Sequence, residues 1–89
     1  MSWEIELDPA AVRELRKLDR PIAKRILDYF HNRLACIENP RSIGEALKGA
    51  KLGELWKYRV GDCRIIAHIE DRELRILVIR IGHRKDVYK

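Results

Sequence analysis

The 89-residue sequence contains few cysteines and no long hydrophobic run. Cys36 and Cys63 are too few for a disulfide framework and lack the CxxC spacing of a zinc site, so we expect two reduced thiols, no metal and no cofactor. No stretch approaches the roughly 18 consecutive apolar residues of a membrane span. The opening MSWEIELD also lacks the charged-then-apolar order of a signal peptide. These absences predict a cytoplasmic protein with no membrane association, folded as one domain over residues 1–89.

The positive charge is unevenly distributed along the chain. Residues 1–47 hold eight Lys or Arg and eight Asp or Glu, whereas residues 48–89 hold eleven and six. The whole net charge of +5 therefore sits in the second half. A sequence pI near 9.5 favours a polyanionic partner such as nucleic acid. Many small basic proteins bind nothing acidic, so the composition alone does not decide whether this protein binds a polyanion.

The first half of the chain predicts a strand followed by two helices. Residues 3–7 alternate apolar and acidic side chains, which is typical of a strand with one solvent-exposed face. Asp8-Pro9 provides an N-cap and a first-turn proline for one helix. A second helix starts near Pro21, carries an apolar stripe with a period of 3.6, and ends at Asn39-Pro40. Residues 41–52 predict a loop with one short helical turn around Glu45 to Lys48.

Three strands are predicted in the second half, at about residues 54–60, 63–70 and 74–82. The last of them is apolar on both faces over Ile76 to Ile79, as expected for a strand inside a sheet. The element order is then β-α-α-β-β-β. This order predicts an α+β fold in which a helical hairpin packs on one face of an antiparallel four-stranded sheet.

The stretch WKYRVGDCR, residues 56–64, predicts a hairpin with Gly61-Asp62 as its turn. In that register Val60 pairs with Cys63, and Arg59 lies opposite Arg64. The apolar set of these strands must meet the helices, so Lys57, Arg59 and Arg64 share the uncovered face of the sheet. A phosphate suits such a cluster, because guanidinium groups bind it bidentately. The alternative is a solvated face on which the long side chains splay apart in water.

The chain ends in GHRKDVYK, residues 82–89, which combines a histidine, three cations and a tyrosine. Such a segment can fold back beside Arg59 and Arg64, and Tyr88 is a platform on which an RNA base can stack. A frayed basic terminus is the alternative. For His83 we weigh a proton-transfer role against an ordinary surface histidine. His31 and His68 are assigned structural roles, and Cys63 is expected to be a small buried or edge residue.

The second half, LKGAKLGELWKYRVGDCRIIAHIEDRELRILVIRIGHRKDVY, resembles RelE-type toxins of the RelE/ParE superfamily of bacterial toxin–antitoxin systems. The similarity extends over nearly the whole chain, including NPRSIGEALKG. Its most specific parts are the hairpin, with Cys63 where the family has tyrosine, and the terminal GHRKDVY. The resemblance implies a cytoplasmic, metal-independent endoribonuclease that cuts mRNA in the ribosomal A site. In the reaction that the resemblance implies, the 2′-OH attacks the adjacent phosphate and leaves a 2′,3′-cyclic phosphate and a free 5′-OH.

Carried over by position, the family's functional residues fall on Lys57, Arg59, Arg64, Arg84 and Tyr88. The resemblance implies that Arg59 and Arg64 hold the scissile phosphate, that Arg84 stabilises or protonates the leaving oxygen, and that Tyr88 orients a base. The wider RNA-binding set adds Lys48, Lys51 and Lys85.

Two positions depart from the best-known member of the family, which has lysine at both. Arg59 is a poor proton acceptor, so Lys57 becomes the candidate general base, on the expectation that neighbouring cations favour its neutral form. His83 is the second departure and a possible acid or base.

Two other functions remain open at this stage. The superfamily's other branch, the ParE-like toxins, poisons DNA gyrase and does not cut RNA, and retention of the hairpin cations with Arg84 and Tyr88 argues against that branch. The third possibility is a non-catalytic module that binds only its antitoxin or RNA. The resemblance further implies an antitoxin partner, acidic or amphipathic, that covers the basic face or displaces the segment around Tyr88.

Overall fold

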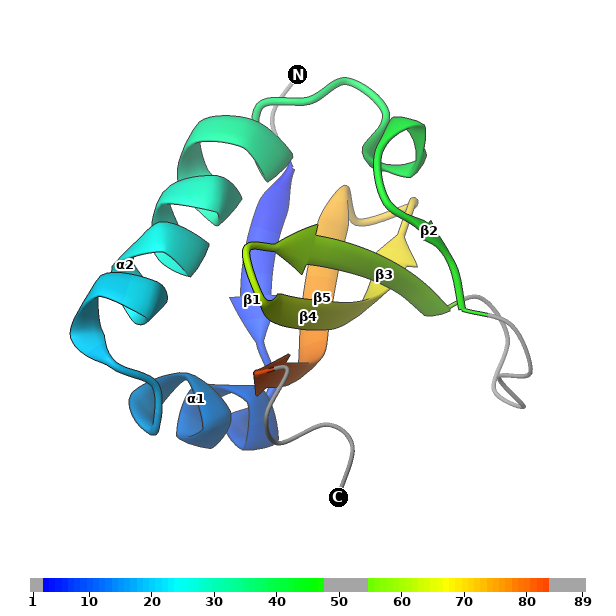
Figure 1. Ribbon diagram of the computed structural model, residues 1–89. Helices are drawn as coiled ribbons and strands as arrows, with labels where there is room; N and C mark the ends of the chain where they lie inside the picture. The colour runs from blue at the N-terminus through cyan, green and yellow to red at the C-terminus, as the bar shows by residue number, and fades with distance from the viewer. Residues whose placement is uncertain (1–2, 48–54, 84–89) are drawn as a thin grey trace.

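The computed structural model describes residues 3–47 and 55–83 (Figure 1). Its elements, in chain order, are β1 (Glu4–Leu7), α1 (Pro9–Arg16), α2 (Arg20–Tyr29), a π-helical turn (Phe30–Leu34), a 3-10 turn (Pro40–Ser42), β2 (Glu45–Ala46), β3 (Leu55–Val60), β4 (Cys63–Glu70) and β5 (Arg75–His83). No helix in these two ranges is long and apolar enough to cross a membrane.

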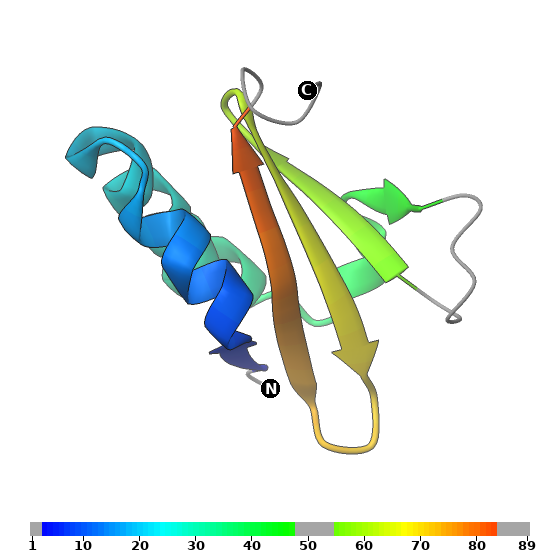
Figure 2. The same ribbon diagram turned by 90° about the horizontal axis from the view of Figure 1, so that it is seen from below.

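Both predicted helices form, and they begin where the sequence indicates. The Asp8 side chain accepts a hydrogen bond from the Ala10 backbone N–H, and Pro9 occupies the first position of α1. Asp19 precedes α2, which runs without a break into the π-helical turn. Both helices lie on the same side of the sheet (Figure 2), so the predicted helical hairpin on one face of an α+β fold is confirmed.

The sheet has five strands and mixed direction, in the order β1-β5-β4-β3-β2. This corrects the expected four-stranded antiparallel sheet in two respects. First, β1 pairs with β5 in parallel, with Ile5 beside Ile76. The helices return the chain to the end of the sheet where β1 begins, because the Trp3 N–H donates to the Ala35 carbonyl, so β3 and β5 run in the direction of β1. Second, Glu45 and Ala46 form β2 instead of a helical turn, since their backbone pairs with the edge of β3 at Lys57 and Trp56.

The core lies between the helices and one face of the sheet. Its buried members come from both layers: Trp3, Ala11, Ile26, Phe30, Leu34, Tyr58, Val60, Cys63, Ile65, Ala67, Ile69, Ile76, Val78 and Ile81. The predicted alternation on β3 and β4 is thereby confirmed. Two aromatic residues of β3 also fix the segment that leads into β2, because Tyr58 Oη donates to the Pro40 carbonyl at 2.7 Å and Trp56 Nε1 donates to the Ile43 carbonyl at 2.7 Å.

A bidentate ion pair ties this segment to the turn between β4 and β5. Arg41 Nη1 and Nη2 donate to the two carboxylate oxygens of Asp71 at 2.9 and 3.0 Å. The hydrogen bonds from Arg41 lower the pKa of Asp71 below its usual range. A carboxyl group with a lowered pKa in the folded state stabilises the protein above its unfolded-state pKa and loses that contribution as the pH falls.

We therefore expect Asp71→Asn to lower the thermal midpoint slightly at neutral pH, by an amount limited by solvent screening of the exposed carboxylate. The difference from wild type should vanish once the pH falls well below about 3.9, where the carboxyl group is protonated in both states. Thermal midpoints measured across this pH range check it. A deficit that stays constant into acid would show that the ion pair does not cause it.

Candidate functional site

The β3–β4 hairpin has the predicted register. Val60 pairs with Cys63, and Arg59 lies directly opposite Arg64. Gly61 adopts φ +58°, a left-handed backbone conformation that favours glycine in a tight hairpin turn. The two arginines therefore project from the same side of the sheet, as the sequence predicted, because directly opposed residues of an antiparallel pair share a face.

We call the surface turned away from α1 and α2 the open face. Pairing across β3, β4 and β5 places two rows of residues on it. One row runs through Arg59, Arg64 and Gly82, and the next through Lys57, Ile66 and Arg80. Since neighbouring strands lie about 4.8 Å apart, each row is only about 10 Å wide at the backbone. We refer to Lys57, Arg59, Arg64 and Arg80 as the cation cluster.

Among the described residues, carboxylates contact Lys57 and Arg80 of the cation cluster. Lys57 Nζ lies 2.9 Å from Glu45 Oε1, with the lysine side chain only 22% exposed. Arg80 Nε lies 3.1 Å from Glu14 Oε2, and its side chain is 66% exposed. Arg59 is exposed and makes no ion pair or side-chain hydrogen bond with any residue that the structure describes. Its guanidinium is therefore available to an anion from solution.

The Glu45–Lys57 pair changes the expectation for Lys57. That expectation considered only neighbouring cations, whereas a carboxylate oxygen of Glu45 lies 2.9 Å from the Lys57 Nζ. Glu45 has a 67% exposed side chain on a two-residue edge strand. For Lys57 to accept a proton, this carboxylate has to move away from it.

Arg80 was not predicted from the sequence. Ile76 and Val78 are buried, so strict alternation of faces along β5 would place Arg80 on the buried face as well. A β-bulge changes this phase, because Ile66 pairs with Arg80 whereas the next residue, Ala67, pairs with Val78. Ile79 is left without a register partner, and Arg80 falls in the open-face row of Ile66 at the edge of β5, where its side chain also meets Glu14 of α1. Alternation on its own carries no signal for a bulge at this position.

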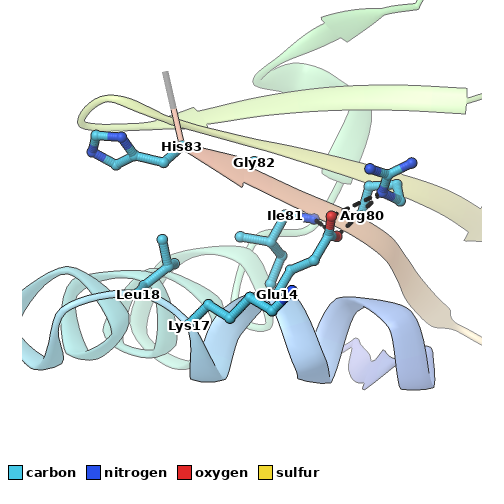
Figure 3. Close-up of a pocket in the computed structure, with 7 residues that line it drawn as sticks. All are labelled: Glu14, Lys17, Leu18, Arg80, Ile81, Gly82 and His83. Carbon is cyan, nitrogen blue, oxygen red and sulfur yellow. Dashed lines mark hydrogen bonds and ion pairs between the residues drawn. The ribbon is translucent and has the colours of Figure 1, made fainter. Parts of the chain in front are cut away.

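His83 is not brought together with the two arginines of the hairpin. It pairs with Cys63, which is buried against the helices, whereas its neighbour Gly82 pairs with Arg64. Its side chain instead lines a pocket of about 300 Å³ with Lys17 and Leu18, the two residues that follow α1 (Figure 3). An acid or base role for His83 thus stays a prediction that the register does not favour.

Cys63 is 1% exposed, as expected for a small buried residue. Burial raises the pKa of its thiol, which disfavours a thiolate nucleophile. Among the residues of the two described ranges, no group of three or more His, Cys, Asp or Glu side chains is placed to hold a metal ion. Five predicted site residues lie outside the described residues: Lys48, Lys51, Arg84, Lys85 and Tyr88.

Comparison with known proteins identifies the family. Residues 5–88 match the family model of the ParE toxin of the type II toxin–antitoxin system parDE. The toxin RelG of Mycobacterium tuberculosis is 25% identical over 89 residues, which are 100% of this chain and 99% of RelG. A RelE-like toxin protein of Escherichia coli is 30% identical over 90 residues, covering 99% of this chain and 92% of that protein.

A solved structure supports the same fold. The toxin–antitoxin complex RelBE2 of Mycobacterium tuberculosis contains a chain that superposes with a TM-score of 0.84 at 23% identity, over 97% of this chain and 95% of that one. The chain described here therefore belongs to the ParE toxin family of type II toxin–antitoxin systems and is a toxin of the RelE type.

Proposed function

We propose that this toxin is a metal-independent endoribonuclease of the cytoplasm that cuts mRNA in the ribosomal A site and so inhibits translation. The observation that carries the proposal is the placement of Arg59 directly opposite Arg64 on the open face. Like charges directly opposite each other on neighbouring strands are destabilising, and a bound anion offsets that repulsion. A phosphodiester supplies that charge and accepts bidentate hydrogen bonds from arginine.

The proposed reaction begins with attack of a 2′-OH on the adjacent phosphate. Negative charge grows on the phosphoryl oxygens in the transition state, where Arg59 and Arg64 stabilise it. Lys57 takes the 2′-OH proton as the neutral amine, after Glu45 has moved away and the ammonium proton has passed to solvent, and Arg84 stabilises or protonates the leaving 5′-oxygen. Tyr88 orients a base, and Lys48, Lys51 and Lys85 hold the RNA backbone.

Replacing Lys57 by arginine separates its two possible roles. Arginine keeps the positive charge but stays protonated, so it cannot act as a general base. If Lys57 is the base, Lys57→Arg should lower the cleavage rate by roughly 10²-fold or more while RNA affinity stays within a few-fold of wild type. Single-turnover cleavage on programmed ribosomes gives the rate. A Lys57→Arg variant that cuts as fast as wild type would restrict Lys57 to binding phosphate.

The proposed protein partner is a cognate antitoxin. RelBE2 of Mycobacterium tuberculosis is a toxin–antitoxin complex, and its toxin-like chain has the fold of this protein. An antitoxin with acidic side chains can neutralise the cation cluster and exclude RNA from the open face. Adding a saturating amount of its antitoxin to the toxin should then abolish cleavage.

The matched family model is named for ParE toxins, and this favours gyrase poisoning as the second candidate. One experiment compares the three functions. Purified toxin is added to ribosomes programmed with mRNA, whose ends are mapped, and in parallel to gyrase with relaxed plasmid. Cuts confined to the A-site codon support the nuclease. Loss of supercoiling with intact mRNA would establish the gyrase poison, and no effect in either assay would leave a binding module.

A further inference from the structure

Glu14 of α1 holds the side chain of Arg80 at the free edge of β5. Beyond Val78, β5 no longer pairs with β1, because β1 ends at Leu7. The Glu14 carboxylate reaches this edge and accepts hydrogen bonds from the Ile81 backbone N–H at 2.8 Å and from Arg80 Nε at 3.1 and 3.2 Å (Figure 3). One carboxylate thus satisfies an edge amide and fixes the arginine.

The geometry of this contact leaves the outer part of the guanidinium exposed. Only Nε is engaged by Glu14, and the Arg80 side chain is 66% exposed whereas the Glu14 side chain is 26% exposed. The two terminal nitrogens of an arginine form the fork that binds phosphate oxygens. An arginine held at Nε has already lost part of its conformational freedom, so less is lost when it binds.

Arg80 lies in the row of Lys57 and Ile66, next to the row of Arg59 and Arg64. The cation cluster therefore spans three strands and is wider than one phosphate group. We infer that Arg80, positioned by Glu14, binds a second phosphate of the RNA, one adjacent to the scissile phosphate. This inference rests on the proposed function, since it assigns a further substrate contact to the same face.

A purely structural role for the Glu14–Arg80 pair makes a different prediction. If the pair only ties α1 to β5, then substitutions there change stability and leave RNA binding alone. If Arg80 binds phosphate, neutralising it removes one released counterion from the binding equilibrium. The salt dependence of RNA affinity therefore distinguishes the two roles.

The test uses a short single-stranded RNA with 2′-O-methyl groups on every ribose, which binds but cannot be cut. Its affinity is measured by fluorescence anisotropy over a series of salt concentrations. Arg80→Gln is expected to weaken binding roughly fivefold to tenfold and to reduce the slope of log affinity against log salt by about 0.7 to 1. Arg72→Gln makes the same charge change at an exposed position in the β4–β5 turn and should shift both quantities much less.

Two Glu14 variants test the positioning. Glu14→Gln keeps an acceptor oxygen for Arg80 and Ile81 and should bind RNA like wild type. Glu14→Ala releases Arg80 but keeps its charge, so compared with Glu14→Gln it should weaken binding by less than Arg80→Gln does and leave the salt slope unchanged. A thermal midpoint measured for each variant shows that it is folded. Should Glu14→Ala fail to fold, Arg80→Gln still decides whether Arg80 binds phosphate.

Arg64→Gln separates failure of this inference from failure of the proposed function. Weakened binding in Arg64→Gln but not in Arg80→Gln would overturn the inference alone. Unchanged binding in both variants, or no RNA binding by wild type, would overturn the RNA-binding role of the open face as well. An Arg80→Gln effect no larger than that of Arg72→Gln would also count against the inference.

Discussion

Arg64→Ala is expected to lower the rate of A-site cleavage by roughly 10²- to 10³-fold, which is the usual effect of removing one preorganised donor from a developing negative charge. Arg64 is partly buried on β4, which is paired on both sides by β3 and β5. A side chain rooted in the middle of a sheet holds its position better than one at an edge. The loss should therefore appear in the cleavage rate of bound mRNA.

The control for this prediction is Arg72→Ala, which removes an exposed arginine at the opposite end of β4. Its cleavage rate should stay close to that of wild type. Circular dichroism and the thermal midpoint should show that both variants are folded. Cleavage by Arg64→Ala within a few-fold of wild type would exclude this arginine from the reacting centre.

Tyr58→Ala is expected to have the largest effect on stability, about 3 to 5 kcal/mol as for other large-to-small substitutions of buried aromatic residues. Tyr58 is 0% exposed, packs near the ring of Tyr29 on α2, and holds the Pro40 carbonyl. Its loss would leave a cavity under the helices and free the segment that leads into β2. Urea unfolding of the variant and of wild type gives the two free energies of unfolding, whose difference measures the effect.

Tyr58→Phe isolates the hydroxyl group. It keeps the ring but leaves the Pro40 carbonyl without its donor, at a cost of about 1 to 3 kcal/mol.

Burial raises the pKa of Tyr58 well above its ordinary value of 10. The unfolded chain therefore releases this proton at a lower pH than the folded protein does, and the stabilisation is lost as the pH rises above about 10. The free energy of unfolding of Tyr58→Phe should therefore fall less than that of wild type as the pH rises above about 10. An identical fall in both proteins would show that other groups cause the pH dependence.

The sequence predicted the hairpin and its faces because alternation over residues 56–64 and a Gly-Asp turn leave one register that buries the apolar set. The placement of Arg59 opposite Arg64 follows from that register. The helix starts were also predictable from a local signal. Pro9 and Pro21 lie in the first turn of α1 and α2, where proline is favoured because its missing N–H is not needed.

Other features depend on pairing between distant segments. A two-residue strand such as Glu45–Ala46 is too short to show a period, so only its contact with β3 defines it. Alternation in β1 is the same whether its partner runs parallel or antiparallel, so it gave no sign that the expected antiparallel pairing was wrong. The Glu45–Lys57 and Glu14–Arg80 pairs likewise join residues that no local pattern connects.

The unpaired Ile79 also affects how this toxin should be aligned with its relatives. A bulge absorbs one additional residue and leaves the flanking segments on their original faces, so a relative one residue shorter between Val78 and Arg80 can present an equivalent surface. A gap placed elsewhere in β5 would match Arg80 to a side chain that points toward the helices. Length differences in this strand should therefore be assigned to position 79 before equivalent residues are compared.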